Sequence, residues 1–154
     1  GLAHHPYGGR GGNYVTPTAE VAEVSLDADG HLRVHKVWCA LDCGLAINPR
    51  LIEAQIEGGI GFALSAALHS EVTFLGGEAL QHDYTNYGAL RLEEMPEIEV
   101  RLLPSAFPPG GVAECAVPPL APAVANAIFA LNGKRMRRLP FRREGIQSAS
   151  VRGV

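Results

Sequence analysis

One carboxylate, Glu114, lies in a stretch whose other residues are small, apolar or proline. Gly110 and Gly111 precede it and allow a sharp bend or a close backbone approach. Three prolines follow, stiffening the chain and favouring a helix start. Such a carboxylate is costly to bury unless hydrogen bonds or a shifted pKa compensate, and a positioned carboxylate can accept a proton. Glu114 is therefore a candidate functional group, and a glutamate that only caps nearby backbone is the structural alternative.

A second candidate lies in a predicted helix over residues 49–69, which is apolar on nearly all sides, as buried helices are. Its interior contains Gly58, Gly59 and Gly61, each costing roughly 0.8–1 kcal/mol relative to alanine. Gln55 precedes the first two by three and four residues, so an amide and a groove without side chains share one face. Two interpretations stay open: a polar contact to a docked ligand, or close packing of the helix on a sheet.

Histidines and cysteines offer a weaker, metal-binding alternative. His4 and His5 are adjacent in a glycine-rich start, and Cys39 and Cys43 are four residues apart with no second pair. Their scatter over the chain argues against one zinc site, and buried thiols are the simpler interpretation. The glycine-rich start has no Gly-Lys-Ser/Thr ending, which excludes a P-loop.

A basic run follows the last predicted helix. Its members are Lys134, Arg135, Arg137, Arg138, Arg142 and Arg143. A solvated surface is the default interpretation, and a partner-docking patch or a contact with a cofactor phosphate is the sharper alternative. The formal net charge of −3 over the whole chain argues against a nucleic-acid binder.

The composition indicates a folded domain. The 154 residues are 47% apolar and 19% charged, which is enough for one sizeable core and argues against disorder. We find no apolar run near 18 residues and no signal peptide, so no transmembrane segment is expected. The sequence does not define the cellular compartment, because a targeting signal could lie upstream of Gly1. Three cysteines do not make a disulfide framework.

Alternating residues predict an antiparallel hairpin of strands 14–26 and 31–42 around a turn at 27–30. In the second strand we expect one face of Leu32, Val34, Lys36, Trp38 and Ala40 and an opposite face of Arg33, His35, Val37, Cys39 and Leu41. A second hairpin is expected over 71–81, with a two-glycine turn, and a further strand over 97–103.

These elements predict an α+β fold, with a mixed or antiparallel sheet of about four to six strands. Two main helices pack on it, near 49–69 and 120–132. We expect residues 1–13 to form a flexible leader, 14–146 the domain, and 147–154 a disordered tail.

Four segments, in this order and spacing, resemble one family. They are residues 37–49, which read VWCALDCGLAINP, residues 55–59, which read QIEGG, residues 96–100, which read PEIEV, and residues 108–129, which begin PPGGVAE. They resemble the C-terminal part of the molybdenum-binding large subunit of the xanthine dehydrogenase and aldehyde oxidase family. The isoquinoline 1-oxidoreductase beta-subunit branch is the most similar, over about residues 14–141.

The resemblance implies a molybdopterin-binding domain, often with the cytosine dinucleotide form of the cofactor in bacteria. It also implies a [2Fe–2S] partner subunit that takes the electrons, and an aldehyde or N-heteroaromatic substrate that receives oxygen from water. Glu114 corresponds to the catalytic general base. The cofactor-binding positions that it implies are Gln55, Gly58, Gly59, Gly111, Val112 and Ala113. The cofactor's sulfurs hold the metal, so no protein metal ligand is expected.

Ala113 departs from the family pattern, which has Gly-Val-Gly-Glu where this chain has Gly-Val-Ala-Glu. Alanine would be strained if that position needed a positive φ, or crowded if it needed bare backbone. The family subunit is several times longer, with further cofactor motifs upstream. We therefore expect a C-terminal portion that binds no molybdenum and is inactive alone. It should expose an apolar patch near the glycine-bearing helix and the Glu114 loop. A non-catalytic assembly module that retains the fold is the alternative.

Overall fold

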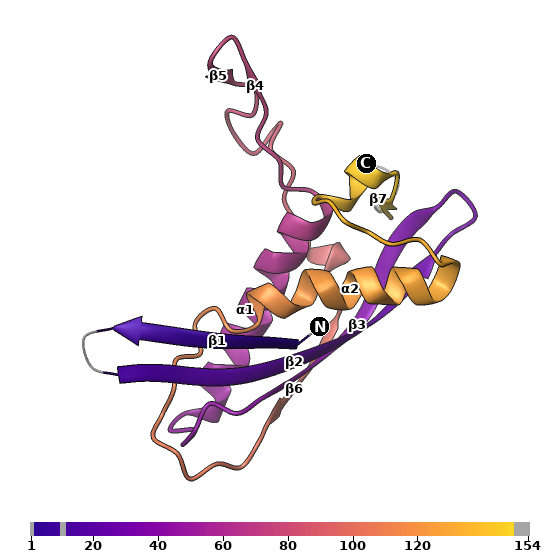
Figure 1. Cartoon of the computed structure of the whole chain (residues 1–154). Coiled ribbons are helices and arrows are strands. Elements are labelled where there is room, and N and C mark those ends of the chain that lie inside the picture. The colour runs from indigo at the N-terminus through magenta and orange to yellow at the C-terminus, as the bar shows by residue number, and fades with distance from the viewer. Residues whose placement is uncertain (1, 10–11, 150–154) are drawn as a thin grey trace.

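The structure is a computed structural model that describes the backbone of residues 2–9 and 12–149 and the side chains of residues 16–149 (Figure 1). The strands of its main sheet are β1 (Leu2–Gly9), β2 (Gly12–Leu26), β3 (His31–Leu41), β6 (Glu97–Leu102) and β7 (Gln147–Ser148). Their order is β1-β2-β3-β6, and β7 also pairs with β3. The β1–β2 and β2–β3 pairs are antiparallel, whereas β6 and β7 run parallel to β3. The predicted mixed sheet is confirmed.

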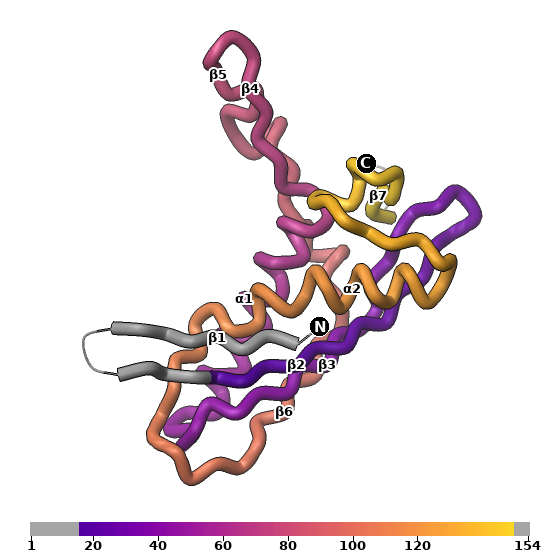
Figure 2. The backbone as a smooth tube through the Cα atoms, viewed as in Figure 1, coloured from indigo at the N-terminus to yellow at the C-terminus, as the bar shows by residue number. Residues whose placement is uncertain are grey.

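Two long helices cover the sheet, as predicted. Helix α1 spans Pro49–Leu68 and helix α2 spans Val117–Asn132. Helix α2 packs against β2 and β1, and α1 packs against α2 and β6. The smaller elements are β4 (Phe74–Leu75), β5 (Glu78–Ala79) and two 3-10 turns, η1 (Leu92–Glu94) and η2 (Phe141–Glu144). The β4–β5 hairpin turns at two glycines with positive φ and projects from the body of the molecule (Figure 2).

The two predicted faces of β3 are wrong for half of the strand, because a bulge changes the alternation. Glu23 pairs with Lys36 and Val24 with Val34, so His35 has no partner in β2. One extra residue moves every later side chain to the other face of the sheet. The buried face of β3 therefore comprises Leu32, Val34, Val37, Cys39 and Leu41.

The boundaries of α1 follow local signals. Asn48 is the N-cap, and its side chain accepts a hydrogen bond from the Leu51 N–H at 3.2 Å. By length and composition alone, α1 is long and apolar enough to cross a membrane, which the sequence analysis did not anticipate. Inside the fold, however, 44% of the 18-residue window is buried, which fits a core helix. Its outward side, which carries both polar residues such as Arg50 and Glu57 and apolar ones such as Leu51 and Phe62, is exposed, so the expected burial on nearly all sides is not found in this chain.

Helix α2 begins at Val117, three residues earlier than predicted. Pro118 and Pro119 lie in the first turn, where a missing N–H removes no helical hydrogen bond. Gly133 closes the helix in the left-handed region with φ +73°, and its N–H bonds to the Phe129 carbonyl. This end of the helix is as predicted.

Parts of the predicted leader, 1–13, and of the predicted tail, 147–154, form strands. The backbone of residues 2–9 forms β1, whose pairing satisfies the peptide groups along the outer edge of β2. Gln147 and Ser148 form β7 against the start of β3. Residues 1, 10–11 and 150–154, and the side chains of His4 and His5, lie outside the described residues.

Candidate functional site

The loop that carries Glu114 leaves β6 and is tied first to the segment that follows β3. The Leu45 N–H donates to the Phe107 carbonyl at 2.9 Å, and the Gly110 N–H donates to the Cys43 carbonyl at 2.7 Å. Gly44 makes this approach possible. Its φ is +71°, and a Cβ there would lie 2.1 Å from the Pro108 oxygen.

Further hydrogen bonds hold the same loop, one of them from the sheet and the others within the loop itself. The Thr16 hydroxyl donates to the Gly111 carbonyl at 2.7 Å, and the Cys115 thiol lies 3.6 Å from the Val112 carbonyl. The Val117 N–H then donates to the Glu114 carbonyl at 3.0 Å where α2 begins. The loop is therefore held on both sides of Glu114.

The Glu114 side chain lies on the exposed side of the loop, beside the glycine-bearing face of α1. A hollow of about 390 Å³ is formed here. Its lining residues are Gly58, Gly59, Phe62, Ala113, Glu114, Val117 and Pro118. The structure thus brings together Glu114 and two of the glycines that the sequence analysis singled out.

A second hollow, of about 440 Å³, adjoins the first through Ala113, which lines both. Gln55 and Val112 line this second hollow, together with Asn48, Leu51 and neighbouring residues. Gln55 and Glu114 therefore line two adjoining hollows and not one. Gly111 lies in the same loop but lines neither hollow, and an added Cβ there would meet no atom within 4 Å.

The sequence left two interpretations open for the interior glycines of α1, close packing or contact with a ligand, and the three glycines differ in this respect. A Cβ on Gly59 would lie 3.4 Å from the Ala116 Cβ, and one on Gly61 would lie 3.1 Å from the Met95 sulfur. The Gly61 contact is tight, so Gly61 serves packing, whereas 3.4 Å is an ordinary van der Waals distance and Gly59 also lines the first hollow. A Cβ on Gly58 would meet nothing within 4 Å and would stand at the first hollow. No packing contact in the described part of the chain explains Gly58.

Ala113 adopts an ordinary backbone conformation. Among the described residues no non-glycine residue has a positive φ, so alanine is not strained at this position. The departure from Gly-Val-Gly-Glu therefore leaves the loop's backbone intact, and only crowding by the methyl group stays open.

Large apolar side chains surround both hollows, as predicted. Phe62 is 71% exposed, Leu51 58% and Ile47 77%. Exposed apolar side chains that gather around a hollow indicate a surface made to be covered by protein or ligand.

A row of buried polar residues on β2 was not predicted from the sequence. Thr16, Thr18 and Glu20 alternate along the strand and are all at most 2% exposed. Burial raises the pKa of Glu20 to about 7, against the smaller, opposite effect of a hydrogen bond from the Cys39 thiol. Burial likewise raises the pKa of Cys39 and Cys115. The period of two was readable in the sequence, but burial of its polar members was not.

The basic run contains paired and unpaired arginines. Glu71 pairs with Arg142 at 2.7 Å and also with Arg143, whose hydrogen bond is the main cause that lowers the pKa of Glu71. Arg135 lies over the Phe129 ring, 3.5 Å from its centroid. The default interpretation of this basic run was a solvated surface. It is incomplete, because several of these arginines make specific contacts within the fold.

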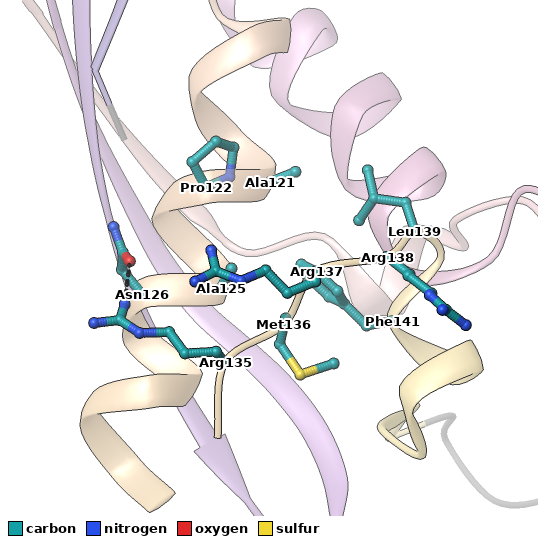
Figure 3. Close-up of a pocket in the computed structure, with 10 residues that line it drawn as sticks. All are labelled: Ala121, Pro122, Ala125, Asn126, Arg135, Met136, Arg137, Arg138, Leu139 and Phe141. Atoms are coloured by element: carbon teal, nitrogen blue, oxygen red, sulfur yellow. Dashed lines mark hydrogen bonds between the residues drawn. The ribbon is translucent and has the colours of Figure 1, made fainter. Parts of the chain in front are cut away.

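Arg135, Arg137 and Arg138 line a hollow of about 370 Å³ beside α2 (Figure 3). Arg135 donates to the Asn126 amide oxygen at 3.3 Å, whereas Arg138 extends away from α2. No carboxylate lines this hollow among the described residues. It is separate from the residues that line the hollow of Glu114.

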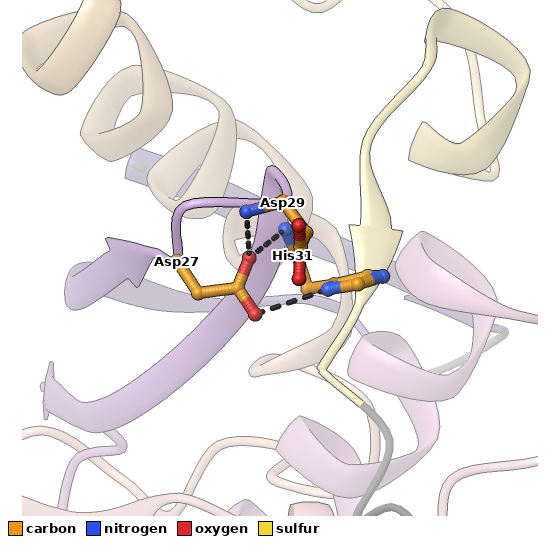
Figure 4. Close-up of side chains that lie close together, drawn as sticks. All are labelled: Asp27, Asp29 and His31. Carbon is orange, nitrogen blue, oxygen red and sulfur yellow. Dashed lines mark hydrogen bonds and ion pairs between the residues drawn. The ribbon is translucent and has the colours of Figure 1, made fainter.

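A group of Asp27, Asp29 and His31 lies at the β2–β3 turn (Figure 4). The Asp27 carboxylate accepts from the backbone N–H groups of Asp29 and His31, and its other oxygen lies 3.0 Å from the His31 ring. These bonds shape the turn, so the group has a structural explanation. The cysteines of the weaker metal hypothesis, Cys39 and Cys43, are buried free thiols, as predicted.

Comparison with known proteins places these features in a family. The family described as molybdopterin cofactor-binding domain matches residues 3–96, a range that ends before the Glu114 loop. The beta subunit of isoquinoline 1-oxidoreductase from Brevundimonas diminuta is 36% identical over 143 residues, which are 92% of this chain and 18% of that relative. A nicotinate dehydrogenase subunit from Pseudomonas putida is 35% identical over 85% of this chain and 11% of its own length. This chain thus spans less than a fifth of these relatives.

Solved structures have the same fold. Quinoline 2-oxidoreductase from Pseudomonas putida 86 superposes with a TM-score of 0.77 and 26% identity, over 85% of this chain and 18% of that chain. Aldehyde oxidoreductase from Desulfovibrio gigas superposes with a TM-score of 0.71 and 24% identity, over 82% of this chain and 14% of that chain. The second likeness, at this identity, concerns the fold alone.

Proposed function

This chain belongs to the family of molybdopterin cofactor-binding domains, and from that premise we propose that it carries the general base of a molybdenum hydroxylase, Glu114. The observation that supports the proposal is the hollow in which Glu114 faces the bare backbone of Gly58. A carboxylate beside open, apolar-walled space can hold and release a proton next to a bound substrate.

The described residues fit a bulky cofactor with its own metal ligands. The space in front of Gly58 and Gly111 is not needed for packing, and Gln55 offers an amide at the adjoining hollow. We propose that Gln55, Gly58, Gly59 and the 111–113 backbone hold this cofactor, with no protein side chain bound to the metal. We propose that this cofactor is the cytosine dinucleotide form of molybdopterin.

The proposed reaction converts a C–H bond and water into a C–OH group, two protons and two electrons. The chemistry that the bound cofactor would supply is the uptake of these two electrons. Glu114 accepts the proton lost by the water-derived nucleophile, and its placement in a restricted hollow typically gives about 10²–10⁴-fold in rate. Phe62 and Val117 give the hollow apolar walls, and we propose that the rest of the large subunit completes the exclusion of bulk water.

The proposed substrate class is an aldehyde or an N-heteroaromatic ring. The names of the relatives support it, since isoquinoline and nicotinate are such rings. The proposed partners are the remainder of a large subunit, which would cover the exposed apolar side chains, and a [2Fe–2S] subunit that takes the electrons. Alone, this chain should bind no molybdenum, and stoichiometric molybdenum in the purified chain would contradict that.

The test is Glu114→Gln in the complete large subunit, co-expressed with its iron–sulfur partner. Turnover of isoquinoline, nicotinate and benzaldehyde is measured with ferricyanide as acceptor, and molybdenum is measured by mass spectrometry. We expect kcat to fall at least about 100-fold at unchanged molybdenum content. Glu57→Gln is the matched control, because Glu57 is an exposed carboxylate on α1 outside the lining of both hollows. An unchanged rate in the Glu114 variant would favour the non-catalytic assembly module.

A further inference from the structure

The Gly111 carbonyl has a single side-chain partner in the described part of the chain, and that partner comes from a distant strand. The Thr16 hydroxyl donates to it at 2.7 Å across a separation of 95 residues. Thr16 is 2% exposed, so its hydroxyl is directed into the fold and has no competing water. This bond connects the sheet directly to the loop of Glu114.

The bond fixes more than one oxygen atom. The peptide between Gly111 and Val112 is trans, and in a planar trans peptide the N–H points opposite to the C=O. With the Gly111 oxygen held toward Thr16, the Val112 N–H must point away from β2. That N–H donates to no other group among the described residues, and Val112 lines the second hollow.

The Cys115 thiol makes a weaker, second tie. It lies 3.6 Å from the Val112 carbonyl, and Cys115 is itself buried, with 1% of its surface exposed. Two successive loop carbonyls, those of Gly111 and Val112, are thus bonded by buried side chains shortly before Glu114. A loop with only its ends anchored would leave these peptides free to rotate.

We propose that Thr16 is a positioning residue for the Glu114 loop: its hydroxyl holds the Gly111–Val112 peptide so that Glu114 and the loop amides face the hollows. This inference rests on the proposed function for its catalytic consequence. Its structural part, the orientation of the loop by a buried hydroxyl, stands on the hydrogen bond alone. Neither the motif around Glu114 nor any local pattern near Thr16 points to it.

The experiment compares three variants of the complete, cofactor-loaded enzyme. Thr16→Val removes the hydroxyl and keeps the branched shape that suits a strand. Thr16→Ser keeps the hydroxyl and should restore the bond. Ser25→Ala is the matched control, because it removes a hydroxyl from the same strand about 30 Å away along β2, where it contacts His35.

We expect Thr16→Val to lower kcat about tenfold with KM within about twofold, because an unpaired buried carbonyl is costly enough to reorient its peptide. Thr16→Ser should retain kcat within about threefold, and Ser25→Ala should equal the wild type. Hydrogen exchange of peptides covering residues 110–115 should accelerate about tenfold in Thr16→Val only. A structural role alone would lower the melting temperature and leave kcat and loop exchange unchanged, which would overturn the proposal.

If Thr16→Val does not accumulate as folded enzyme, Thr16→Ala and Thr16→Ser replace it, and equal kcat and equal loop exchange in these two would overturn the proposal. Failure of the proposed function looks different. In that case Glu114→Gln keeps its turnover, while the effect of Thr16 on loop exchange persists. Loss of turnover in Glu114→Gln together with wild-type kcat and wild-type loop exchange in Thr16→Val contradicts only the positioning role.

Discussion

From the burial of Glu20 we predict a specific dependence of the unfolding free energy on pH. Its side chain is 2% exposed on the face of β2 that packs under α2, and burial raises its pKa from 4.5 to about 7. In the unfolded chain the carboxyl would ionise near its ordinary value of 4.5. Between these two pKa values the folded chain holds a proton that the unfolded chain has released.

The sign follows from proton linkage. Because the folded state binds the extra proton, the stability that protonated Glu20 contributes is fully present below pH 4.5 and is lost as the pH rises to about 7. At about 1.4 kcal/mol per pH unit, the loss amounts to about 3 kcal/mol. Glu20→Gln keeps the size of the side chain and removes the ionisable group, so the loss should disappear.

Urea unfolding of this chain, followed by circular dichroism from pH 5 to pH 8, measures the effect. The wild type should lose about 2–3 kcal/mol over this range relative to Glu20→Gln, and the difference should level off above pH 7. Glu23→Gln is the control, because Glu23 is exposed on the opposite face of the same strand. Equal pH profiles for the wild type and Glu20→Gln would refute the assigned burial of this carboxyl.

Two glycines give further predictions with opposite effects on stability. Gly58→Ala should raise the unfolding free energy by up to about 1 kcal/mol, since the added Cβ meets no atom, yet it should lower molybdenum content or kcat in the complete enzyme. Wild-type values of both would contradict a ligand at the first hollow. Gly44→Ala should cost at least about 3 kcal/mol in urea unfolding, because φ is +71° and the Cβ would overlap the Pro108 oxygen. A change below about 0.5 kcal/mol would contradict the tie between Gly44 and the 107–110 segment.

Local signals in the sequence were sufficient for most elements. The N-cap Asn48, the C-terminal glycine of α2 and the two-glycine turn of the β4–β5 hairpin act within a few residues of themselves. Such signals depend on backbone geometry at one position, so a sequence contains them in full. The helix boundaries and the β2–β3 hairpin were accordingly predicted within a few residues.

Features that depend on a distant partner were not predictable in the same way. The bulge at His35 exists only relative to the register of β2, and it reverses the faces of half of β3. Residues 2–9 and 147–148 lack a strong strand pattern of their own and become strands because β2 and β3 offer unpaired edges. Glycine-rich or short segments at chain ends are easily read as flexible for this reason.

The same difference between local signals and distant partners applies to the candidate site. The motif at residues 110–114 and its resemblance to a family pointed to Glu114, and the spacing of Gln55, Gly58 and Gly59 indicated a shared face of α1. What the sequence could not contain was the arrangement in three dimensions: two adjoining hollows that share Ala113, and a hydroxyl from β2 that bonds to the loop. The residue types were readable, whereas their distances required the fold.

The two sides of the Glu114 loop have opposite physical character, and this difference bears on where the chemistry can happen. Behind the loop, Thr16 and Cys115 bond its carbonyls in a dry interior, so its backbone has little freedom. In front of it, nothing in the described part of the chain covers Phe62 or Leu51, each of which would gain roughly 1.5–3 kcal/mol on full burial. A general base works best where water is excluded, because charge is then stabilised only by fixed groups. The loop is thus held from behind in this chain, while the dry front wall that the proposed role of Glu114 requires must come from whatever covers Phe62 and Leu51. Under that proposal, covering those side chains and completing the site are one event.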